Sequence, residues 1–377
     1  RQRQMCIRDR LKFKAKKVKE NLERIGKLDF NAENAPEFYD CIGMDVPWNY
    51  RNKAQFPIGR NKEGKIIAGF YAGRTHSIIE CEDCAIGIKE NKDILHMVIA
   101  HMEKWKIEPY REEDHKGLVR HVLIRKGFTT GEIMVCLILN GKKFPGLSEL
   151  VDNLKKIDGM TSISINVNTE HTNRILGSEV IPVYQEVYIT DYIGDVKFRI
   201  SPLSFYQVNP VQAEKLYNFA INAAKLKKND TLLDAYSGTG TIGIIASDRV
   251  KAVQGIEYNS AAVRDAVQNC KLNGITRNAA FNRGDAGEYL RERAKKGVRF
   301  DAVIMDPARA GADKQFLRAL SVIRPERIVY ISCNPVTLAR DLRTLTKNYN
   351  VECIQPFDMF PFTRHVECVV SMSRKSE

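Results

Sequence analysis

Residues 231–243 read TLLDAYSGTGTIG, an apolar run that ends in an acid and passes directly into a glycine-rich loop. Glycines at positions 238, 240 and 243 allow the backbone of such a loop to pass close to a ligand at the N-terminus of the following helix. The stretch therefore predicts a Rossmann-like α/β unit, in which a ligand binds at the carboxyl edge of a parallel sheet.

Short apolar runs alternate with helical patterns after Asp230, which is typical of a parallel sheet. We expect five parallel strands, at 231–235, 252–256, 279–282, 302–305 and 327–332. Two further runs, 351–355 and 365–372, have no long helix between them, so the last strand should return antiparallel beside the fifth. This order predicts the seven-stranded sheet of a class I methyltransferase.

Acids close three successive strands of this sheet: Asp234, Glu257 and Asp285. The three glycines also satisfy the dinucleotide fingerprint G-x-G-x-x-G, so they leave both a nicotinamide cofactor and S-adenosylmethionine open. Asp234 suits the positive amino group of S-adenosylmethionine better than a pyrophosphate, Glu257 can accept both ribose hydroxyls, and Asp285 can meet the adenine edge. The alternative is that these acids only cap the helices that follow them.

A thiol stands at the end of the fifth strand, in Ser332-Cys333-Asn334-Pro335. A cysteine in an apolar strand is usually structural, but Asn334 and Pro335 end this strand and turn the backbone outward. Carbon 5 of a uracil takes a methyl group only after a nucleophile has added at carbon 6, and a thiolate is a strong nucleophile near neutral pH. Cys333 therefore predicts covalent catalysis of uracil-C5 methylation in RNA.

That reaction also needs a separate base, which removes the proton from carbon 5. If the last strand runs antiparallel beside the fifth, its first residues, 364–367, lie near Cys333. Glu367 is the predicted base. His365 is the competing candidate, with an ordinary pKa of about 6.5; two residues away along the same strand, it would point to the same face and orient the carboxylate.

The composition is that of a large globular protein. The chain has 377 residues, 44% of them hydrophobic, with no apolar run near the roughly 20 residues of a membrane helix. Residues 1–10 are polar and basic, unlike a secretory signal, and nine scattered cysteines favour a reducing compartment, so we expect a cytoplasmic protein. A formal net charge of +13 favours a polyanion partner such as RNA, although ordinary basic enzymes share such charges.

Residues 39–200 have a mixed pattern that predicts an α+β module. We expect strands at 118–126, 132–140, 160–168 and 185–193, and a helix at 147–157. RNA-binding proteins combine cations for phosphates with planar rings for bases; the alternative here is a charged surface over an aromatic core. The candidate RNA contacts are Trp48, Tyr50, Arg51, Lys53, Arg74, Arg120, Arg125 and Lys126.

An amphipathic helix at 11–28 precedes this module, and we expect it to be solvated with one apolar side. Its apolar face holds Leu11, Phe13, Val18, Leu22 and Ile25, with lysines around the other face. The predicted domains are a basic N-terminal segment with this helix at 1–35, an RNA-binding α+β domain at 36–199 and a methyltransferase domain at 200–377.

Several motifs together resemble the RumA/TrmA family of RNA uracil-C5 methyltransferases, over nearly the whole chain. They are Phe205-Tyr206-Gln207-Val208-Asn209, residues 234–240, Asp306-Pro307-Ala308-Arg309-Ala310-Gly311, residues 332–335 and His365-Val366-Glu367. Within the family, residues 48–53 and the cysteine segment 81–84 resemble the bacterial 23S ribosomal RNA branch more than the tRNA branch.

The resemblance implies that Cys333 is the nucleophile and Glu367 the base. It also implies an S-adenosylmethionine pocket lined by Gln207, Tyr236, Gly238, Thr241, Glu257 and Asp306. Phe205 would face a uracil flipped out of its stack, and we expect Arg309 and His365 to contact the RNA as well. Relatives often carry Asn at the position of Thr241, a second Pro at that of Ala308 and a His at that of Phe362, but none of these departures removes a reacting group.

Ribosomal members of the family carry a small β-barrel domain and three cysteines ahead of the helix that matches 11–28. A later cysteine, which Cys84 resembles, completes a [4Fe-4S] cluster in those relatives. The upstream trio is missing from this sequence, so we expect no assembled cluster and no bound metal, and our hypothesis is that an N-terminal segment was lost. Cys81-x-x-Cys84 alone is a weak metal motif.

Other functions stay open. An RNA cytosine-C5 methyltransferase carries a second cysteine in the loop after the fourth strand, where this chain has Ala308 and Arg309. The further alternatives are a tRNA uracil-C5 methyltransferase, a nicotinamide dehydrogenase and a noncatalytic RNA-binding ribosome factor. We expect a monomer that binds 23S ribosomal RNA and has no obligate protein partner.

Overall fold

The computed structural model describes residues 7–73 and 75–376, so Arg74 of the predicted RNA contacts and most of the segment 1–10 lie outside the described residues. The chain divides into two compact units: residues 1–46 with 211–377, and residues 47–210. Both breaks come later than the predicted ones at 35/36 and 199/200. The first does so because β1 (Glu37–Phe38) pairs with β16 (Tyr349–Phe357) and so joins the first unit.

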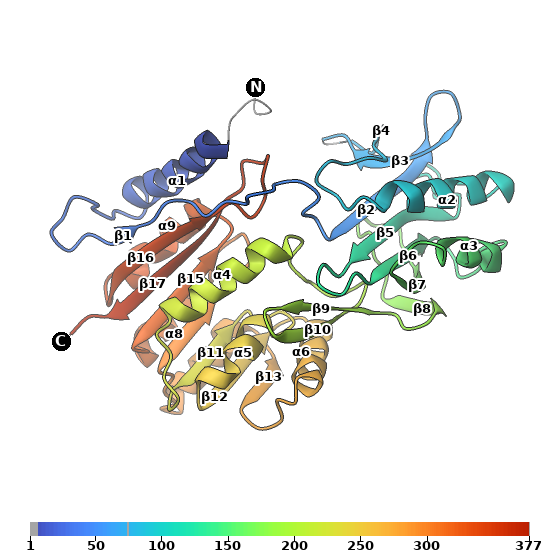
Figure 1. Ribbon diagram of the computed structural model, residues 1–377. Helices are drawn as coiled ribbons and strands as arrows, with labels where there is room; N and C mark the ends of the chain where they lie inside the picture. The colour runs from blue at the N-terminus through green and yellow to red at the C-terminus, as the bar shows by residue number, and fades with distance from the viewer. Residues whose placement is uncertain (1–6, 74, 377) are drawn as a thin grey trace. The chain divides into compact units, whose positions relative to one another are not determined.

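The first unit is built on a sheet with the strand order β1-β16-β17-β15-β14-β11-β12-β13 (Figure 1). The parallel strands are β11 (Thr231–Ala235), β12 (Ala252–Glu257), β13 (Ala279–Arg283), β14 (Ala302–Met305) and β15 (Arg327–Ser332). As predicted, β17 (Glu367–Arg374) runs antiparallel beside β15, and it also pairs with β16. The predicted seven-stranded Rossmann-like sheet is confirmed, and β1 extends it at one edge.

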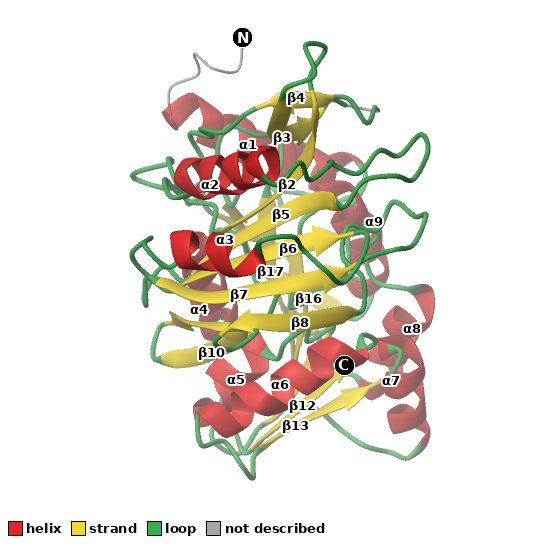
Figure 2. Cartoon of the chain, turned by 90° about the vertical axis from the view of Figure 1, so that its right-hand side faces the viewer, coloured by secondary structure: helices red, strands yellow, loops and turns green. Residues whose placement is uncertain are grey.

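Helices cover both faces of this sheet. One face carries α4 (Pro210–Ala223), α5 (Thr241–Ala246) and α6 (Ser260–Leu272), and the other carries α7 (Ala286–Lys295), α8 (Lys314–Ile323) and α9 (Pro335–Leu345) (Figure 2). The N-terminal helix α1 (Ile7–Arg24) packs with the second set, because its Val18 and Leu22 belong to the same buried cluster as Phe316 and Leu338. Burial of these apolar side chains is the main force that holds the helices on the sheet.

Short polar side chains cap the helices at the carboxyl edge of the sheet. Asn259, Asp285, Asp313 and Asn334 each accept a hydrogen bond from a backbone N–H in the first turn of α6, α7, α8 and α9. Pro335 adds a preset backbone at the start of α9. The caps satisfy otherwise unpaired N–H groups and fix the strand-to-helix loops at this edge.

The second unit is an α+β module, as predicted, with the strand order β4-β3-β2-β5-β6-β7-β8 and a separate β9–β10 hairpin. Its elements are β2 (Lys53–Arg60), β3 (Ile66–Tyr71), β4 (Ile78–Glu80), α2 (Asn91–Lys104), β5 (Val119–Lys126), β6 (Ile133–Leu139), α3 (Leu147–Leu154), β7 (Met160–Val167), β8 (Glu179–Tyr184), β9 (Ile189–Ile193) and β10 (Val196–Ile200). The strand predicted at 185–193 starts only at Ile189, because Gln185 has a left-handed backbone (φ +51°) that a strand cannot contain.

Three of the predicted RNA contacts serve the core of the second unit instead. Tyr50, Arg120 and Arg125 are buried. Arg125 donates hydrogen bonds to the carbonyls of Ser201 and Ser204, each at 3.1 Å. Arg120 likewise donates to the carbonyls of Asn168 and Glu170 inside the unit. For these three buried residues the alternative of an aromatic and charged interior was right.

The face of α1 differs from the predicted one. Phe13 is 48% exposed, whereas Arg10 and Lys14 are buried with Val18 and Leu22. The two cations turn inward because both form ion pairs with Asp358, an acid that is fully buried. Within the described ranges, no helix combines the length and the apolar content that crossing a membrane requires.

Candidate active site

The loop after β11 is held by Asp234, whose Oδ2 accepts the N–H of Gly243 at 2.8 Å. Its Oδ1 is buried and has no hydrogen-bond partner in the part of the chain that the structure describes. Gly240 has a left-handed backbone (φ +80°), and a Cβ there would lie 2.9 Å from side-chain carbons of both Ala266 and Phe281. The sequence therefore needs glycine at this position, as the motif suggested.

Glu257 bridges the glycine loop and the start of α6. Its Oε2 accepts the N–H of Gly238 at 3.0 Å, and its Oε1 accepts the N–H of Asn259 at 2.7 Å. An ionised carboxylate has about four acceptor positions, so two remain for the hydroxyls of a ligand. Asp285 uses one oxygen to cap α7 through the N–H of Glu288 at 3.0 Å, so the capping alternative holds for at least part of its role.

Acids gather at this edge: Asp234 is buried, and Glu257 and Asp306 are half-buried. Burial raises the pKa of Asp234 to about 7, helped by the charges of Asp306 and Glu257, and burial also raises the pKa of Asp306 to about 7. Among the described residues, no Lys or Arg forms an ion pair with these three acids. A cationic ligand would stabilise their ionised forms, and S-adenosylmethionine, with its ammonium and sulfonium groups, is such a ligand.

Cys333 and Glu367 come from neighbouring antiparallel strands. Ser332 of β15 pairs with Cys368 of β17. Cys333 follows Ser332 and Glu367 precedes Cys368, so both lie at the carboxyl edge of the sheet, close enough for the charge of Glu367 to act on the thiol. The predicted nucleophile and the predicted base are thus brought together, as the expected antiparallel return of the last strand required.

The Cys333 thiol is half-buried and free. Burial raises its pKa to about 11, the charges of Glu367 and Asp306 add to the shift, and the charge of Arg309 opposes it. The thiol is therefore protonated at neutral pH until the charges around it change. These electrostatic effects also place Glu367, Asp306 and Arg309 around the sulfur.

Glu367 is 7% exposed. Its burial raises the pKa of the carboxyl to about 8, the charge of Asp306 raises it further, and the charge of Lys14 opposes the shift. A carboxyl group with a pKa near the working pH can both take up and release a proton, as a general base must.

His365 lies just before β17, not in it, so the strand predicted at 365–372 starts two residues later. The N–H of His365 donates to Thr363 Oγ1 at 3.2 Å, and Thr363 Oγ1 donates to the carbonyl of Phe360 at 2.8 Å. This turn takes His365 out of the strand and removes the reason to expect it on the same face as Glu367. Burial, Arg309 and neighbouring cations lower its pKa below the ordinary value.

Arg309 belongs to the loop that follows β14. Its carbonyl accepts hydrogen bonds from Asn334 Nδ2 at 3.2 Å and Thr337 Oγ1 at 3.3 Å, which tie this loop to the start of α9. The side chain is exposed, and its charge acts on both Cys333 and His365. A positive charge therefore lies beside the thiol.

A buried ion cluster under the site was missed by the sequence analysis. Lys14 Nζ donates to Asp358 Oδ1 and, at 3.0 Å, to the carbonyl of Phe360, while Arg10 Nε donates to Asp358 Oδ2 at 2.8 Å. Lys17 Nζ donates to the carbonyl of Arg364 at 3.0 Å. α1 therefore fixes the segment 358–366 that leads into Glu367. The only signal in the sequence was the spacing of residues 10, 14 and 17 on one helical face.

A family model of tRNA (uracil-5-)-methyltransferases matches residues 14–375. The chain belongs to this family. Two similar members are uncharacterized RNA methyltransferases. One, of Clostridium tetani, is 41% identical over 371 residues, which cover 98% of this chain and 79% of the relative. The other, of Halalkalibacterium halodurans, is 43% identical over 368 residues, which cover 97% and 79%.

A solved structure is similar to the whole chain. It is the tRNA (uracil-54, C5)-methyltransferase of Pyrococcus abyssi in complex with S-adenosyl-L-homocysteine, with a TM-score of 0.80 and 28% identity, over 98% of this chain and 84% of that one. The predicted RNA uracil-C5 methyltransferase family, the Rossmann-like methyltransferase fold and the RNA methyltransferase class of enzyme are confirmed.

Tyr236 and Thr241, which the family resemblance assigned to the cofactor, lie at the two ends of the glycine loop. Tyr236 has a left-handed backbone (φ +61°), its ring packs on Phe316 with centroids 5.3 Å apart, and its hydroxyl donates to Asp313 Oδ2 at 3.3 Å. Thr241 opens α5. Gln207 and Phe205 belong to the second unit, so their contacts with cofactor and uracil stay predictions.

Cys84, which resembles the fourth cluster cysteine of ribosomal family members, neighbours Cys81 in the second unit. Burial raises the pKa of the Cys81 thiol, and the adjacent Cys84 adds to the shift. Across residues 7–73 and 75–376, no group of three His, Cys, Asp or Glu side chains is arranged to hold a metal ion.

Proposed function

We propose that this family member transfers a methyl group from S-adenosylmethionine to carbon 5 of a uridine in 23S ribosomal RNA, with Cys333 as nucleophile and Glu367 as base. One observation carries the proposal: the register of β15 and β17 sets a half-buried thiol near a buried carboxyl group at the carboxyl edge of the sheet. Uracil-C5 methylation needs this pair of groups, because one adds to the ring and the other removes a proton from it.

The chemistry follows from the two side chains. The Cys333 thiol gives its proton to solvent water and its sulfur bonds to carbon 6, which opens the C5=C6 double bond and places negative charge on carbon 5 and oxygen 4. When bound, S-adenosylmethionine supplies the methyl group for carbon 5. Glu367 then accepts the proton that carbon 5 still carries. The electrons of that C–H bond restore the C5=C6 bond and release the Cys333 thiolate.

We assign Asp234, Glu257 and Asp306 to the cofactor, because they gather negative charge at the edge of the sheet without a cation of their own among the described residues. Asp234 Oδ1, buried and without a partner in the described chain, supports the same assignment. The remaining cofactor contacts of the proposal are Gln207, Tyr236, Gly238, Thr241 and Asp285. Phe205, Arg309 and His365 are its RNA contacts.

The choice of RNA rests on two stretches of the second unit. Trp48-Asn49-Tyr50-Arg51-Asn52-Lys53 and Cys81-Glu82-Asp83-Cys84 resemble the ribosomal branch of the family. Transfer RNA is the second candidate, because the similar structure from Pyrococcus abyssi is a tRNA (uracil-54, C5)-methyltransferase.

The test is incubation of the protein with radiolabelled S-adenosylmethionine and, separately, unmodified 23S RNA and unmodified tRNA, followed by nucleoside analysis. Label in 5-methyluridine of 23S RNA supports the proposal, and label in tRNA alone supports the second candidate. Label in 5-methylcytidine, or no label in either RNA, contradicts both.

A matched pair of cysteine variants sharpens this test. Cys333→Ala should abolish methylation, because the sulfur that bonds to carbon 6 is gone. Cys353→Ala removes another half-buried thiol of the same sheet, one that contacts Ser371 Oγ at 3.1 Å, and should leave methylation intact. Equal losses in the two variants would show that the effect of Cys333 is structural.

The setting of the reaction is part of the proposal. All eight cysteines of the described chain are free, which supports a reducing compartment such as the cytoplasm. We assign RNA binding to the α+β unit, residues 47–210, and the chemistry to the other unit, in a protein that works as a monomer.

A further inference from the structure

Positive charge is unevenly divided between the two units. Residues 47–210 contain 22 Lys and Arg against 20 Asp and Glu, so 11 of the 13 excess positive charges belong to the unit that carries the candidate active site. That site itself is acidic, with Asp234, Glu257, Asp306 and Glu367 at the carboxyl edge of the sheet. Arg309 lies beside the thiol, but other cations of this unit lie away from the site.

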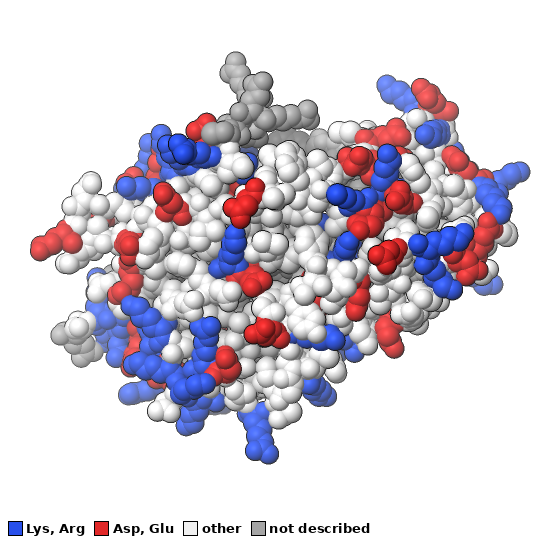
Figure 3. Space-filling view, in the orientation of Figure 1, with Lys and Arg blue, Asp and Glu red and all other residues white. Residues whose placement is uncertain are grey.

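Many of these cations lie at the opposite, amino edge of the sheet. Lys227 and Lys228 precede β11, Lys251 precedes β12, Arg299 precedes β14, and Arg374 ends β17. In Figure 3, Lys and Arg side chains gather at the lower left, where Figure 1 draws the turn between α4 and β11. The sheet thus has an acidic carboxyl edge and a basic amino edge.

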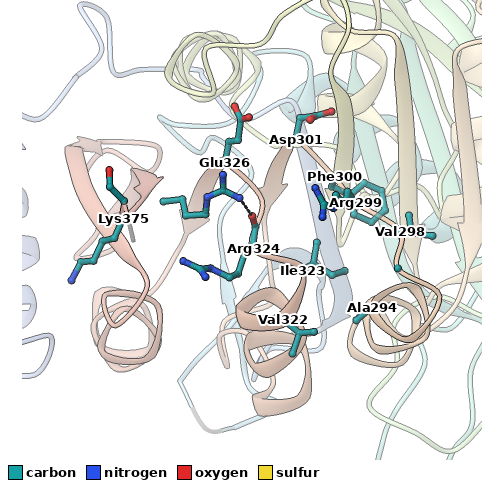
Figure 4. Close-up of a pocket in the computed structure, with 13 residues that line it drawn as sticks. Ala294, Val298, Arg299, Phe300, Asp301, Val322, Ile323, Arg324, Glu326 and Lys375 are labelled. Carbon is teal, nitrogen blue, oxygen red and sulfur yellow. Dashed lines mark hydrogen bonds between the residues drawn. The ribbon is translucent and has the colours of Figure 1, made fainter.

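Two adjoining pockets hollow this basic side. One, of about 580 Å³, is bounded by the ends of α7, α8 and β17 and is lined by Arg299, Arg374 and Lys375 among others (Figure 4). The second, of about 440 Å³, shares Ala294 and Val322 with the first and is lined by Arg291, Lys295 and Arg318. We call five of these cations the basic surface: Arg291, Lys295, Arg299, Arg318 and Arg374.

The charges of the basic surface are not neutralised by the protein. In the part of the chain that the structure describes, no acid lies within ion-pair distance of any of its five cations. The two acids of the larger pocket are already engaged: Asp301 Oδ2 accepts the N–H of Thr231 at 2.7 Å, and Glu326 pairs with Arg327 at 3.8 Å. Several exposed cations of the second unit do pair with acids, for example Lys142 with Glu179 and Lys155 with Asp152.

Helix dipoles account for only part of this arrangement. Lys295 lies in the last turn of α7, where a cation stabilises the helix end. Arg291 and Arg318 lie in the middle of α7 and α8, beyond the reach of that effect. Cations held on one face without acids are a surface that polyanions bind through the release of counterions.

We propose that the basic surface binds backbone phosphates of the RNA substrate, in a segment outside the one that enters the active site. This inference rests on the proposed function in so far as RNA is the substrate. At the carboxyl edge Arg309 lies among several acids, so a long RNA gains affinity by laying a second segment along the basic side of the same unit. A short RNA that carries only the target uridine does not reach it.

The test compares two double variants for binding to an unmodified 23S RNA transcript and to a short oligonucleotide with one uridine. The first variant, Arg299→Gln with Arg318→Gln, removes two charges of the basic surface. The control variant, Lys142→Gln with Lys155→Gln, removes two charges that already form ion pairs with acids. Both pairs are exposed, and thermal unfolding checks that each variant folds. For the transcript, the first variant should raise Kd roughly tenfold and reduce the slope of log K against log salt by about 1 to 2.

Binding of the short oligonucleotide and its turnover number should not change in either variant. Unchanged transcript binding in the first variant, or equal losses in the two, overturns the proposal. Because binding is measured without methylation, it separates the two claims: a protein that binds through the basic surface but makes no 5-methyluridine contradicts the proposed function alone.

Discussion

Cys333 carries a thiol whose pKa of about 11 reflects burial first and then the negative charges of Glu367 and Asp306. We predict that alkylation of this thiol by iodoacetamide speeds up with pH along a strongly alkaline curve. In Glu367→Gln the curve should shift to lower pH, because one of the two charges that oppose thiolate formation is gone. Mass spectrometry of the Cys333 peptide gives the rate, and an identical curve in the variant would show that the two groups do not interact.

Glu367 should act after the methyl transfer, not before it. In Glu367→Gln the thiol can still add to the ring, but the proton on carbon 5 stays in place. We therefore predict a methylated RNA–protein complex that survives denaturing gel electrophoresis, with turnover reduced by about 100-fold to 10,000-fold. Glu352→Gln, an exposed acid of the adjacent strand β16, is the control and should behave like the wild type. Wild-type turnover in Glu367→Gln would exclude Glu367 as the base.

The same carboxyl group should make stability depend on pH. The pKa of Glu367 is raised to about 8 in the folded protein, so its contribution to stability is fully present below the unfolded pKa and is lost as the pH rises through about 8. Glu367→Gln should therefore melt at a higher temperature than the wild type above pH 8 and at a similar temperature near pH 5. Scanning calorimetry at both pH values checks this, and a variant that is less stable at the alkaline pH would contradict the assigned burial.

α1 and the segment 358–366 act together as one element under the site. Lys14 and Asp358 are both fully buried and paired, and breaking a buried pair destabilises a protein by about 3–5 kcal/mol. We predict such a loss for Lys14→Met in chemical denaturation. Because the charge of Lys14 lowers the pKa of Glu367, the rise of activity with pH should also move to higher pH.

The exposed neighbour Lys16 provides the control, since its ion pair with Glu20 lies at the surface. Lys16→Met should change neither stability nor the pH profile by a measurable amount. A loss of stability in Lys14→Met without any movement of its pH profile would reduce the cluster to a purely structural role.

At the scale of elements, local pattern was enough for the strands of the sheet and for the antiparallel return of β17, because apolar runs and their spacing follow directly from the sequence. The face of α1 could not be predicted in this way. Its buried cations, Arg10 and Lys14, form ion pairs with an acid more than 340 residues away. The helical pattern alone predicts that charged side chains face the solvent. His365 was misplaced for a similar reason, since a hydrogen-bonded turn at Thr363 delays the strand.

In the whole molecule, the carboxyl edge of the sheet brings together the candidate site residues, which are spread over more than 130 residues of the sequence, from Asp234 to Glu367. The strand-end positions predicted this gathering, because parallel strands present their carboxyl ends at one edge. The structure was needed to find the unit boundaries, because they depend on which distant segments pair. It was also needed to find the basic edge, because the sequence does not show which cations form ion pairs with acids.

This gathering of acids predicts how the cofactor should bind. The pKa values of Asp234 and Asp306 are about 7 in the protein, and a cation prefers the ionised forms. Affinity for S-adenosylmethionine should therefore rise from about pH 6 to about pH 8, and it should rise less for S-adenosylhomocysteine, whose sulfur is uncharged. Calorimetric titration at the two pH values measures this, and equal pH dependence for the two ligands would argue against the sulfonium as the group that these acids meet.

Covalent attack by Cys333 on carbon 6 of a uracil can be caught directly with RNA in which 5-fluorouridine replaces uridine, because the fluorine on carbon 5 cannot leave as a proton does. Incubation of such RNA with the protein and S-adenosylmethionine, followed by digestion and mass spectrometry, identifies the bonded residue. We predict a methylated 5-fluorouridine attached to the Cys333 peptide. An adduct on another cysteine, or methylated RNA that forms without any adduct, would contradict this account.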